Sequence, residues 1–479
     1  MASRSNNGRT ERTPVRGEAR TTGGVAVPLL AWAVTRTALL LYVFKVFSLP
    51  GGLDVTTDVS VIYHGWFTQL SAGSFPTDDV TWQYPPAAAL AILSPGLLTG
   101  LGLLSYAAAF FVLACAADAA VLALLLYASR ARARAPADGA RRAGVWVWIV
   151  GVPLLGPTAY ARYDLMVTAL AVAALLAAAR HPRAAGALAG LGAMVKVWPV
   201  LLLLGTPRGR VTRTVWLSAL LTAAVVVTLF TATMPGALDF VTAQGGRGTE
   251  VESLGALVLH VARHFGWEGQ VLLNYGSMEF VGPHVRLVSD AALVLTVLGF
   301  GWLLLWRLRA REWTRSTPAD AAFAAVLIFT TTSRVLSPQY LIWLVGLAAV
   351  CLTLRASRQA LPAALVLAAT GLTLLEFPIW FTHVVMSDGP GVLVLGARNG
   401  LLVAASLLAC ARLWRSTVTE PRLRDEDEDA GSDSRSDGSD SGSGSGGSGS
   451  GSDGSGPEAD GDGGASRAHS PSGDRLLTW

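Results

Sequence analysis

Residues 103–128 read LLSYAAAFFVLACAADAAVLALLLYA, an apolar run that contains a single charged residue, Asp118. Such a run exceeds the roughly 20 residues that an α-helix needs to cross the hydrocarbon core of a bilayer. Comparable runs recur from Val25 to Leu413 in a chain of 479 residues, of which 52% are hydrophobic and only 15% are charged. The sequence therefore predicts an all-α polytopic membrane protein.

Arginine clusters predict how the spans are oriented, because cytoplasmic loops retain positive charge. These clusters occupy six segments, at 130–142, 180–183, 208–213, 307–315, 355–358 and 412–424. The loops expected outside the cytoplasm are poorer in positive charge and lie at 49–84, 234–285 and 383–390. Ten long crossings are predicted, at 25–48, 103–128, 144–160, 164–180, 214–233, 286–308, 318–333, 338–354, 359–380 and 391–413. This arrangement places both termini in the cytoplasm and the protein in the plasma membrane.

Two further apolar segments are broken and cannot be simple crossings. Residues 85–98 contain Ser94-Pro95-Gly96, and we expect a short re-entrant segment there. Residues 185–204 are interrupted at Lys196-Val197-Trp198-Pro199, which predicts two half-length helices that meet near the outer face. Non-helical backbone at membrane depth is tolerated only where protein or a water-filled cavity surrounds it. Both breaks therefore predict an internal cavity that opens outward.

Composition divides the chain into three parts. Residues 1–24 are polar and arginine-rich, residues 25–415 form the membrane domain, and residues 416–479 combine an acidic run with Ser, Gly and Asp repeats. Such a tail cannot bury a core, so both terminal segments are expected to be disordered and cytoplasmic. The net charge of +4 averages a basic body with an acidic tail and does not predict nucleic-acid binding. The cysteines, at 115, 351 and 410, lie within apolar spans and suggest packing rather than disulfides.

Four cationic side chains are predicted to gather on the outer side of the membrane, at Arg162, Lys196, Arg247 and Arg334. Charged groups inside spans are costly and usually face a cavity or a partner, and a phosphate group is a partner that such a cluster would bind. The alternative is internal ion pairing, for example of Arg162 with Asp164 and of Arg247 with Glu252.

The acidic loop from Leu49 to Tyr84 has no Lys or Arg, and its Asp58 is the candidate general base. A carboxylate held at the membrane surface can take the proton from an attacking hydroxyl group. The alternative role for Asp58 is to cap a short helix that starts at Val59. The loop's other acidic residues, Asp54, Asp78 and Asp79, are weaker candidates for the base, and solvation is the role expected for them.

The sequence offers no reliable metal or nucleotide site. His260 and His264 are four residues apart, but the glutamate of the zinc-protease pattern is missing, so we expect no metal. A glycine-rich nucleotide loop of the P-loop or Rossmann type is also missing. We therefore expect no cofactor, and a donor substrate carried by a lipid rather than by a soluble nucleotide.

An ordered set of short motifs extends this interpretation. It comprises Asp58 with Tyr63 and Gly73, Tyr84-Pro85-Pro86, Arg162-Tyr163-Asp164-Leu165, Gly190-Leu191-Gly192 before Lys196-Val197-Trp198-Pro199, Arg247-Gly248 with Glu252-Ser253, and Ser337-Pro338-Gln339-Tyr340. In this order the motifs resemble bacterial glycosyltransferase family 87, the polyprenol-phosphate-mannose-dependent mannosyltransferases of the C-type membrane superfamily. The resemblance covers about residues 25–415.

The resemblance implies a C-type bundle of about 10–12 transmembrane helices and a hexosyltransferase activity. It implies transfer of a sugar, usually mannose, from polyprenyl phosphate to a glycolipid or glycan outside the cytoplasm, with inversion and with Asp58 as base. Membrane lipids and these two substrates are the expected partners. We expect donor-phosphate contacts from Lys196, Arg162, Arg247 and Arg334. Sugar and acceptor contacts are expected from Tyr63, Tyr84, Asp164, Glu252 and Gln339. A transporter or flippase of a lipid-linked sugar remains the alternative, because broken helices and buried charge suit that class too.

Overall fold

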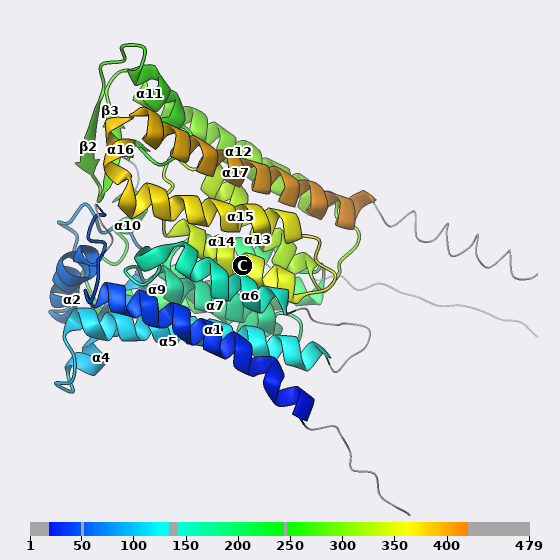
Figure 1. Ribbon diagram of the computed structural model, residues 1–479. Helices are drawn as coiled ribbons and strands as arrows, with labels where there is room; N and C mark the ends of the chain where they lie inside the picture. Colours follow the sequence, from blue (N-terminus) through cyan, green and yellow to red (C-terminus); the bar gives the residue numbers. More distant parts are fainter. Residues whose placement is uncertain (1–18, 49–51, 134–141, 244–246, 420–479) are drawn as a thin grey trace, which may run out of the picture. The chain divides into compact units, whose positions relative to one another are not determined.

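The computed structural model describes residues 19–48, 52–133, 142–243 and 247–419, and the apolar runs form helices that pack into one bundle (Figure 1). Most of the two predicted terminal segments lies outside these ranges. In chain order the elements are α1 (Ala19–Val43), η1 (Asp58–Tyr63), α2 (His64–Ser71), α3 (Ala88–Leu93), α4 (Gly96–Thr99), α5 (Tyr106–Ala133), α6 (Ala143–Leu154), η3 (Gly156–Ala159), α7 (Asp164–Ala177), α8 (Pro182–Val195), η4 (Trp198–Gly205), α9 (Arg210–Thr233), α10 (Phe240–Ala243), β1 (Thr249–Glu250), α11 (Ala256–Arg263), β2 (Gln270–Asn274), β3 (Ser277–Val281), α12 (Val285–Arg309), α13 (Thr317–Thr332), α14 (Tyr340–Thr353), α15 (Ala360–Leu374), η5 (Leu375–Ile379), α16 (Phe381–Met386), α17 (Gly389–Trp414) and η6 (Arg415–Thr419).

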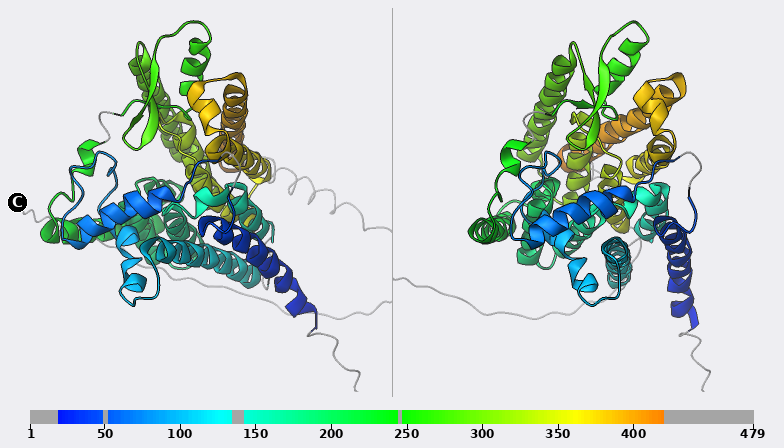
Figure 2. Two further views of the ribbon diagram at one scale, coloured as in Figure 1. Left: turned by 60° about the vertical axis from the view of Figure 1, so that its left-hand side comes forward. Right: turned by 90° about the vertical axis from the view of Figure 1, so that its left-hand side faces the viewer.

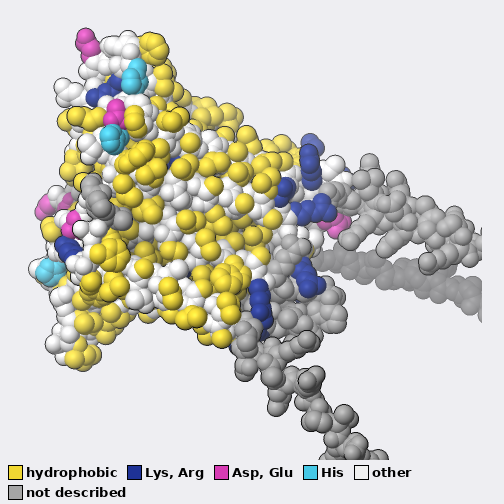
Figure 3. Space-filling model, viewed as in Figure 1, with side chains coloured by type: hydrophobic (Ala, Val, Ile, Leu, Met, Phe, Trp, Pro, Cys, Tyr) yellow, Lys and Arg dark blue, Asp and Glu magenta, His cyan; other side chains and the backbone are white. Residues whose placement is uncertain are grey.

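The two ends of the bundle differ in structure and in charge. One end, here called the loop face, is formed by η1, α2, α4, α11, α16 and the β2–β3 hairpin (Figures 1 and 2). The opposite end, here called the arginine face, carries Arg208, Arg307, Arg358 and Arg412, and cationic side chains gather there in Figure 3. The long helices run between the two faces.

The predicted all-α polytopic membrane fold is confirmed. Six helices in the described ranges are long and apolar enough to cross a bilayer, and they belong to α1, α5, α9, α12, α15 with η5, and α17 with η6. Their outward surfaces carry exposed apolar side chains, such as Leu220 and Leu221 on α9 and Leu293 on α12. A continuous apolar surface of this kind suits contact with lipid.

Four of the ten predicted crossings, α6, α7, α13 and α14, are shorter than a bilayer is thick. The 14 residues of α14 extend about 21 Å, whereas the hydrocarbon core is about 30 Å thick. Every residue of α14 from Leu341 to Thr353 is buried among other helices. Protein therefore surrounds the ends of these short helices, which allows non-helical backbone at membrane depth.

The structure confirms that both broken segments fail to form one long helix. Residues 85–98 contain only the short helices α3 and α4, and α4 lies at the loop face (Figure 1). Residues 185–204 form α8 and the 3₁₀-helix η4, which meet at Lys196. One cavity borders α8 and η4 with the exposed Arg315 in its lining, toward the arginine face, and the outward-opening cavity expected at the two breaks stays a prediction.

A small antiparallel sheet, which we did not predict, lies within the predicted outer loop 234–285. Its strand order is β1-β3-β2, and Glu250 pairs with Glu279 across β1 and β3. Tyr275 and Gly276 connect β2 to β3 with positive φ angles of 49° and 75°. Two such residues form the tight turn that suits the twist of a hairpin.

A buried ion pair joins α1, α5 and α6. The Nε atom of Arg36 donates to Asp118 at 2.7 Å, and both side chains are almost fully buried. Pro153 has no N–H group, so the carbonyl of Ile149 lacks its usual helical donor. Arg36 Nη1 donates to that carbonyl oxygen at 2.6 Å. The polar group that proline leaves unpaired is thus satisfied by the same guanidinium that neutralises Asp118.

Replacing Arg36 with Met would leave the Asp118 carboxylate buried without its counter-ion. We expect Arg36→Met to lower the free energy of unfolding by about 3–5 kcal/mol. Lys45→Met is the control, because Lys45 pairs with Asp54 at 2.9 Å on the exposed surface and should change stability by at most about 1 kcal/mol. Thermal unfolding in a mild detergent measures both effects. Equal stability of the two variants would show that the buried pair does not hold the helices together.

Candidate functional site

Lys196 stands at the break between α8 and η4. Pro199 cannot donate a hydrogen bond to the carbonyl of Val195, so the α-helix cannot continue across this point. Lys196 is accordingly extended, with φ −156° and ψ 131°, while its own N–H group still donates to Gly192 at 2.8 Å. The break turns the chain back toward the arginine face and leaves the ammonium group inside the bundle.

One carboxylate and a group of aromatic rings hold this ammonium group. Lys196 Nζ donates to Asp164 Oδ1 at 2.8 Å, and the same oxygen accepts from Trp343 Nε1 at 2.6 Å. The ring centroids of four residues lie 5.1 to 5.7 Å from Nζ, and these are Tyr84, Tyr163, Tyr340 and Trp343. Cations are attracted to aromatic faces within about 6 Å, so the rings stabilise a desolvated positive charge. The site therefore keeps a cation in a region with little water.

This arrangement retains unused hydrogen-bonding capacity. An ammonium group has three donors, and within the described ranges Lys196 Nζ uses one, to Asp164. The Oδ2 atom of Asp164 is buried and has no hydrogen-bond partner there. Unpaired buried polar atoms are uncommon because they lose hydration without compensation. The Lys196–Asp164 pair can thus accept a further polar group without breaking its own bond.

Asp58 lies beside this aromatic group as the first residue of η1. Its carboxylate forms an ion pair with the guanidinium of Arg162, and the Asp58 side chain remains 33% exposed. The N-cap position of η1 belongs to Thr57, so the alternative in which Asp58 caps a helix starting at Val59 is wrong. Asp58 therefore keeps access to solvent while Arg162 fixes its orientation.

Tyr63 connects the Asp58 pair to the rings around Lys196. Its ring stacks on Trp66 with centroids 5.3 Å apart and contacts Tyr163 with centroids 5.8 Å apart. Burial raises the pKa of Tyr63 well above its ordinary value, so this phenol stays protonated. Tyr84 also contacts Tyr163, at 5.3 Å. Tyr63, Tyr84 and Tyr163 thus form one continuous aromatic wall between the two charged pairs.

Arg247 anchors the small sheet next to this wall. Its guanidinium pairs with Glu279 on β3 at 3.3 Å and donates to Gln83 Oε1 at the same distance, next to Tyr84. Glu250 on β1 accepts from the N–H group of Leu336 at 2.6 Å and from the Ser337 hydroxyl at 3.0 Å. Burial raises the pKa of Glu250, and the positive charge of Arg247 opposes this rise. The sheet thereby holds the segment that leads into α14.

Most of the predicted site residues lie in this one cluster. Asp58, Arg162, Tyr63, Tyr84, Asp164 and Lys196 are linked by the contacts above, and Arg247 joins through Gln83. Gln339 and Arg334 flank the cluster, since Gln339 precedes α14 and the Arg334 carbonyl accepts from the Glu250 N–H group at 3.0 Å.

Internal ion pairing does occur, but the predicted partners are wrong. Arg162 pairs with Asp58 rather than Asp164. Arg247 pairs with Glu279 rather than Glu252. The carboxylate of Asp164 instead belongs to Lys196, which comes from a different helix.

Glu252 is the predicted site residue that the structure places elsewhere. It is buried in a separate polar group with Glu376, Arg398 and Asn399, and its backbone carbonyl accepts from Arg398 at 3.2 Å. The structure thus separates Glu252 from the cluster, and its expected contact with sugar hydroxyls stays a prediction. In a continuous strand Glu250 and Glu252 would point to the same face, because side chains alternate along extended backbone. The strand β1 ends at Glu250 and the chain then turns, so the two side chains reach different partners.

Five residues of the cluster were not predicted. Tyr163 and Tyr340 stand inside the quoted motifs beside Asp164 and Gln339, so adjacency could have suggested them. Gln83 precedes Tyr84 in the same way. The other two, Trp343 and Glu279, carry no sequence signal, because their positions depend on how α14 and β3 pack.

His260 is occupied by structural hydrogen bonds. Its Nδ1 lies 2.7 Å from the Ser387 hydroxyl, and its Nε2 lies 2.8 Å from the Val251 carbonyl oxygen. Burial lowers the pKa of His260 to about 4, so the ring is neutral near pH 7. Neither nitrogen is free to ligate zinc together with His264.

Comparison with known proteins identifies the family of the chain. A sequence model of glycosyltransferase family 87 matches residues 82–338, which is more than half of the chain. The matched region includes Tyr84, Arg162, Asp164, Lys196 and Arg247. No curated protein matches the chain. The chain belongs to glycosyltransferase family 87 and is a multi-pass membrane glycosyltransferase.

Proposed function

We propose that this enzyme transfers a sugar, with mannose as the first candidate, from a polyprenyl-phosphate donor to a hydroxyl group of a glycolipid or glycan. The observation that carries the proposal is the cluster itself. The partly exposed carboxylate of Asp58 is separated from the ammonium group of Lys196 by the aromatic wall. Within the described ranges, two N–H donors of that ammonium group form no hydrogen bond. A base and a phosphate-binding cation are the two groups that such a transfer needs.

The proposed orientation has the loop face outside the cytoplasm and the arginine face inside, in the plasma membrane. The cations of the arginine face support this orientation, because positive charge is retained on the cytoplasmic side. The ends of α1 and α17 toward that face would place both termini in the cytoplasm (Figure 1).

Lys196 is the proposed first contact of the donor phosphate. Its remaining N–H groups would donate to phosphate oxygens while Asp164 and the four rings orient the ammonium group. Stabilisation of a leaving phosphate by fixed charge is strongest where water is scarce. Arg162, Arg247 and the flanking Arg334 are proposed as further ligands, since one guanidinium can bond to a carboxylate and a phosphate at once.

Asp58 is the proposed general base. It would take the proton from the acceptor hydroxyl as that oxygen attacks the anomeric carbon. The new glycosidic C–O bond forms while the bond from the anomeric carbon to the phosphate oxygen breaks, and polyprenyl phosphate leaves. A single displacement of this kind inverts the anomeric configuration. Arg162 orients the carboxylate, and the proposed sugar and acceptor contacts come from Tyr63, Tyr84, Asp164 and Gln339.

A flippase that binds the same lipid is the second candidate, because α8 and η4 form a broken helix like those of transporters. Incubating the purified enzyme with radiolabelled polyprenyl-phosphate-mannose and an envelope glycolipid extract separates the two. The proposal requires label in a new glycolipid. Label that only changes leaflet in vesicles would favour the flippase.

The role of Asp58 is tested by Asp58→Asn, which keeps the size of the side chain and removes its basicity. We expect turnover to fall by about 10²–10⁴-fold, the usual contribution of a general base. Asp54→Asn is the matched control in the same loop, because Asp54 pairs with Lys45 at 2.9 Å outside the cluster. Its turnover should stay near that of the wild type. Near-normal transfer by folded Asp58→Asn would remove Asp58 from the mechanism.

The role of Lys196 is tested with its counter-ion neutralised as well. Lys196→Met combined with Asp164→Asn leaves no unpaired buried charge, so the protein should fold. We expect turnover to fall by about 10²–10³-fold, as when a fixed charge at a leaving group is lost. Gel filtration and thermal unfolding establish folding. A folded double variant with wild-type turnover would contradict phosphate binding by Lys196.

A further inference from the structure

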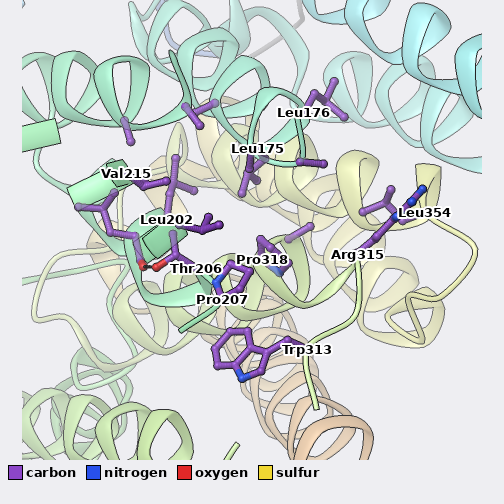
Figure 4. A pocket seen from close by; sticks show the side chains of 18 of the residues that line it. Leu175, Leu176, Leu202, Thr206, Pro207, Val215, Trp313, Arg315, Pro318 and Leu354 are labelled. Atoms are coloured by element: carbon purple, nitrogen blue, oxygen red, sulfur yellow. Dashed lines mark hydrogen bonds between the residues drawn. The ribbon is translucent and has the colours of Figure 1, made fainter. Parts of the chain in front are cut away.

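A cavity lies near the arginine face, at the opposite end of the bundle from the proposed catalytic cluster. Its volume is about 240 Å³, and its walls come from α7, α8, η4, α9 and the start of α13 (Figure 4). Leu175, Leu202, Leu203 and Val215 line it, together with several alanines. None of the residues in the proposed catalytic cluster contributes to its walls, so the cavity is distinct from that cluster.

The cavity is accessible at its polar rim. Val211, Thr314 and Arg315 on the rim are exposed, whereas Ala185 and Ala189 in the wall are buried. The adjoining helix α9 has few buried residues and presents apolar side chains outward, as expected for contact with lipid. An empty apolar cavity lowers stability in proportion to its volume, so an apolar occupant from the membrane would be favoured.

Two guanidinium groups stand beside this rim. Arg307 donates to the carbonyl of Thr206, a lining residue, and lies 4.5 Å from the ring centroid of Trp313, another lining residue. Arg208 donates to the carbonyl of Leu308 at 2.8 Å and also to the carbonyl of Arg307. Within the described ranges both guanidinium groups bond only to neutral oxygens. Two neighbouring positive charges are thus left without a carboxylate.

We propose that this cavity binds one acyl chain of an anionic phospholipid, whose phosphate group bonds to Arg208 and Arg307. The apolar walls fit the chain, and the two uncompensated guanidinium groups fit the headgroup. Basic residues at the cytoplasmic end of a membrane protein attract anionic lipids in this way. The bound lipid would fill the cavity bordered by α7, α8, η4 and α13, and so support the two half-length helices that meet at Lys196.

Photocrosslinking tests this assignment with the full-length protein in lipid nanodiscs. The probes are phosphatidylglycerol and phosphatidylcholine, each with a diazirine near the end of one acyl chain. Peptides from α7, α8, η4 and residues 313–319 are analysed by mass spectrometry. We expect these peptides to carry at least about tenfold more label from phosphatidylglycerol, because only that headgroup has a net negative charge.

Three variants make the test specific. Arg208→Gln with Arg307→Gln should remove the preference for phosphatidylglycerol. Ala185→Leu with Ala189→Leu, one helical turn apart on α8, should fill the cavity and remove the label with both probes. Arg412→Gln is the matched control, because Arg412 also bonds to a backbone carbonyl at the arginine face but does not line the cavity. Its labelling should equal that of the wild type.

Several outcomes would overturn the proposal. Equal labelling by the two lipids, or labelling that persists in the folded Arg208→Gln and Arg307→Gln variant, would remove the headgroup site. Label confined to the outer surfaces of α9 and α12 would show that no chain enters the cavity. Stronger labelling by a photoreactive polyprenyl phosphate than by phosphatidylglycerol would assign the cavity to the donor lipid.

Discussion

The central constraint in this fold is that a lysine ammonium group inside a membrane bundle needs a counter-charge. Lys196 reaches this position because the helix breaks before Pro199, and Asp164 reaches it as the first residue of α7. Trp343, from the buried helix α14, donates to the same carboxylate. Three short helices therefore end or begin around one buried ion pair. Their shortness, which would be unfavourable in lipid, is what brings their ends together.

The three main cations of the proposed catalytic cluster are each paired with a carboxylate. Lys196 pairs with Asp164, Arg162 with Asp58, and Arg247 with Glu279. An anionic donor would therefore have to share these cations with carboxylates. In the proposed reaction this competition would favour catalysis. A phosphate that attracts the Arg162 guanidinium would weaken the ion pair between Arg162 and Asp58. On this proposal the base would become more available as the donor binds, which would couple donor binding to activation of the acceptor.

Sequence reasoning predicted the bundle well because bilayer thickness and positive charge restrict the possible spans. It also located the break at Lys196, since a proline deep within an apolar run interrupts the helix in the turn before it. The β2–β3 hairpin was missed, although Asn274-Tyr275-Gly276 contains a turn signal. Bilayer thickness restricts the length of a membrane span but not the structure of a loop, so it gave no guide to residues 234–285. The ion-pair partners were assigned by closeness in sequence, whereas Lys196 and Asp164 are 32 residues apart and meet only through helix packing. Pairing over such distances does not follow from the sequence alone.

The two faces of the bundle use arginine in different ways. At the loop face, Arg162 and Arg247 bond to carboxylates, which a phosphate can replace or join without leaving a guanidinium unpaired. At the arginine face, Arg208 and Arg307 bond to carbonyl and hydroxyl oxygens, and among the residues that the structure describes no carboxylate pairs with them. The first arrangement suits a ligand that must bind and leave in each catalytic cycle. The arrangement of Arg208 and Arg307 favours an anion that remains bound. If that anion dissociated, the two neighbouring guanidinium groups would repel each other again. A substrate that turns over at one end and a lipid that remains at the other are therefore compatible with the same preference of arginine for phosphate.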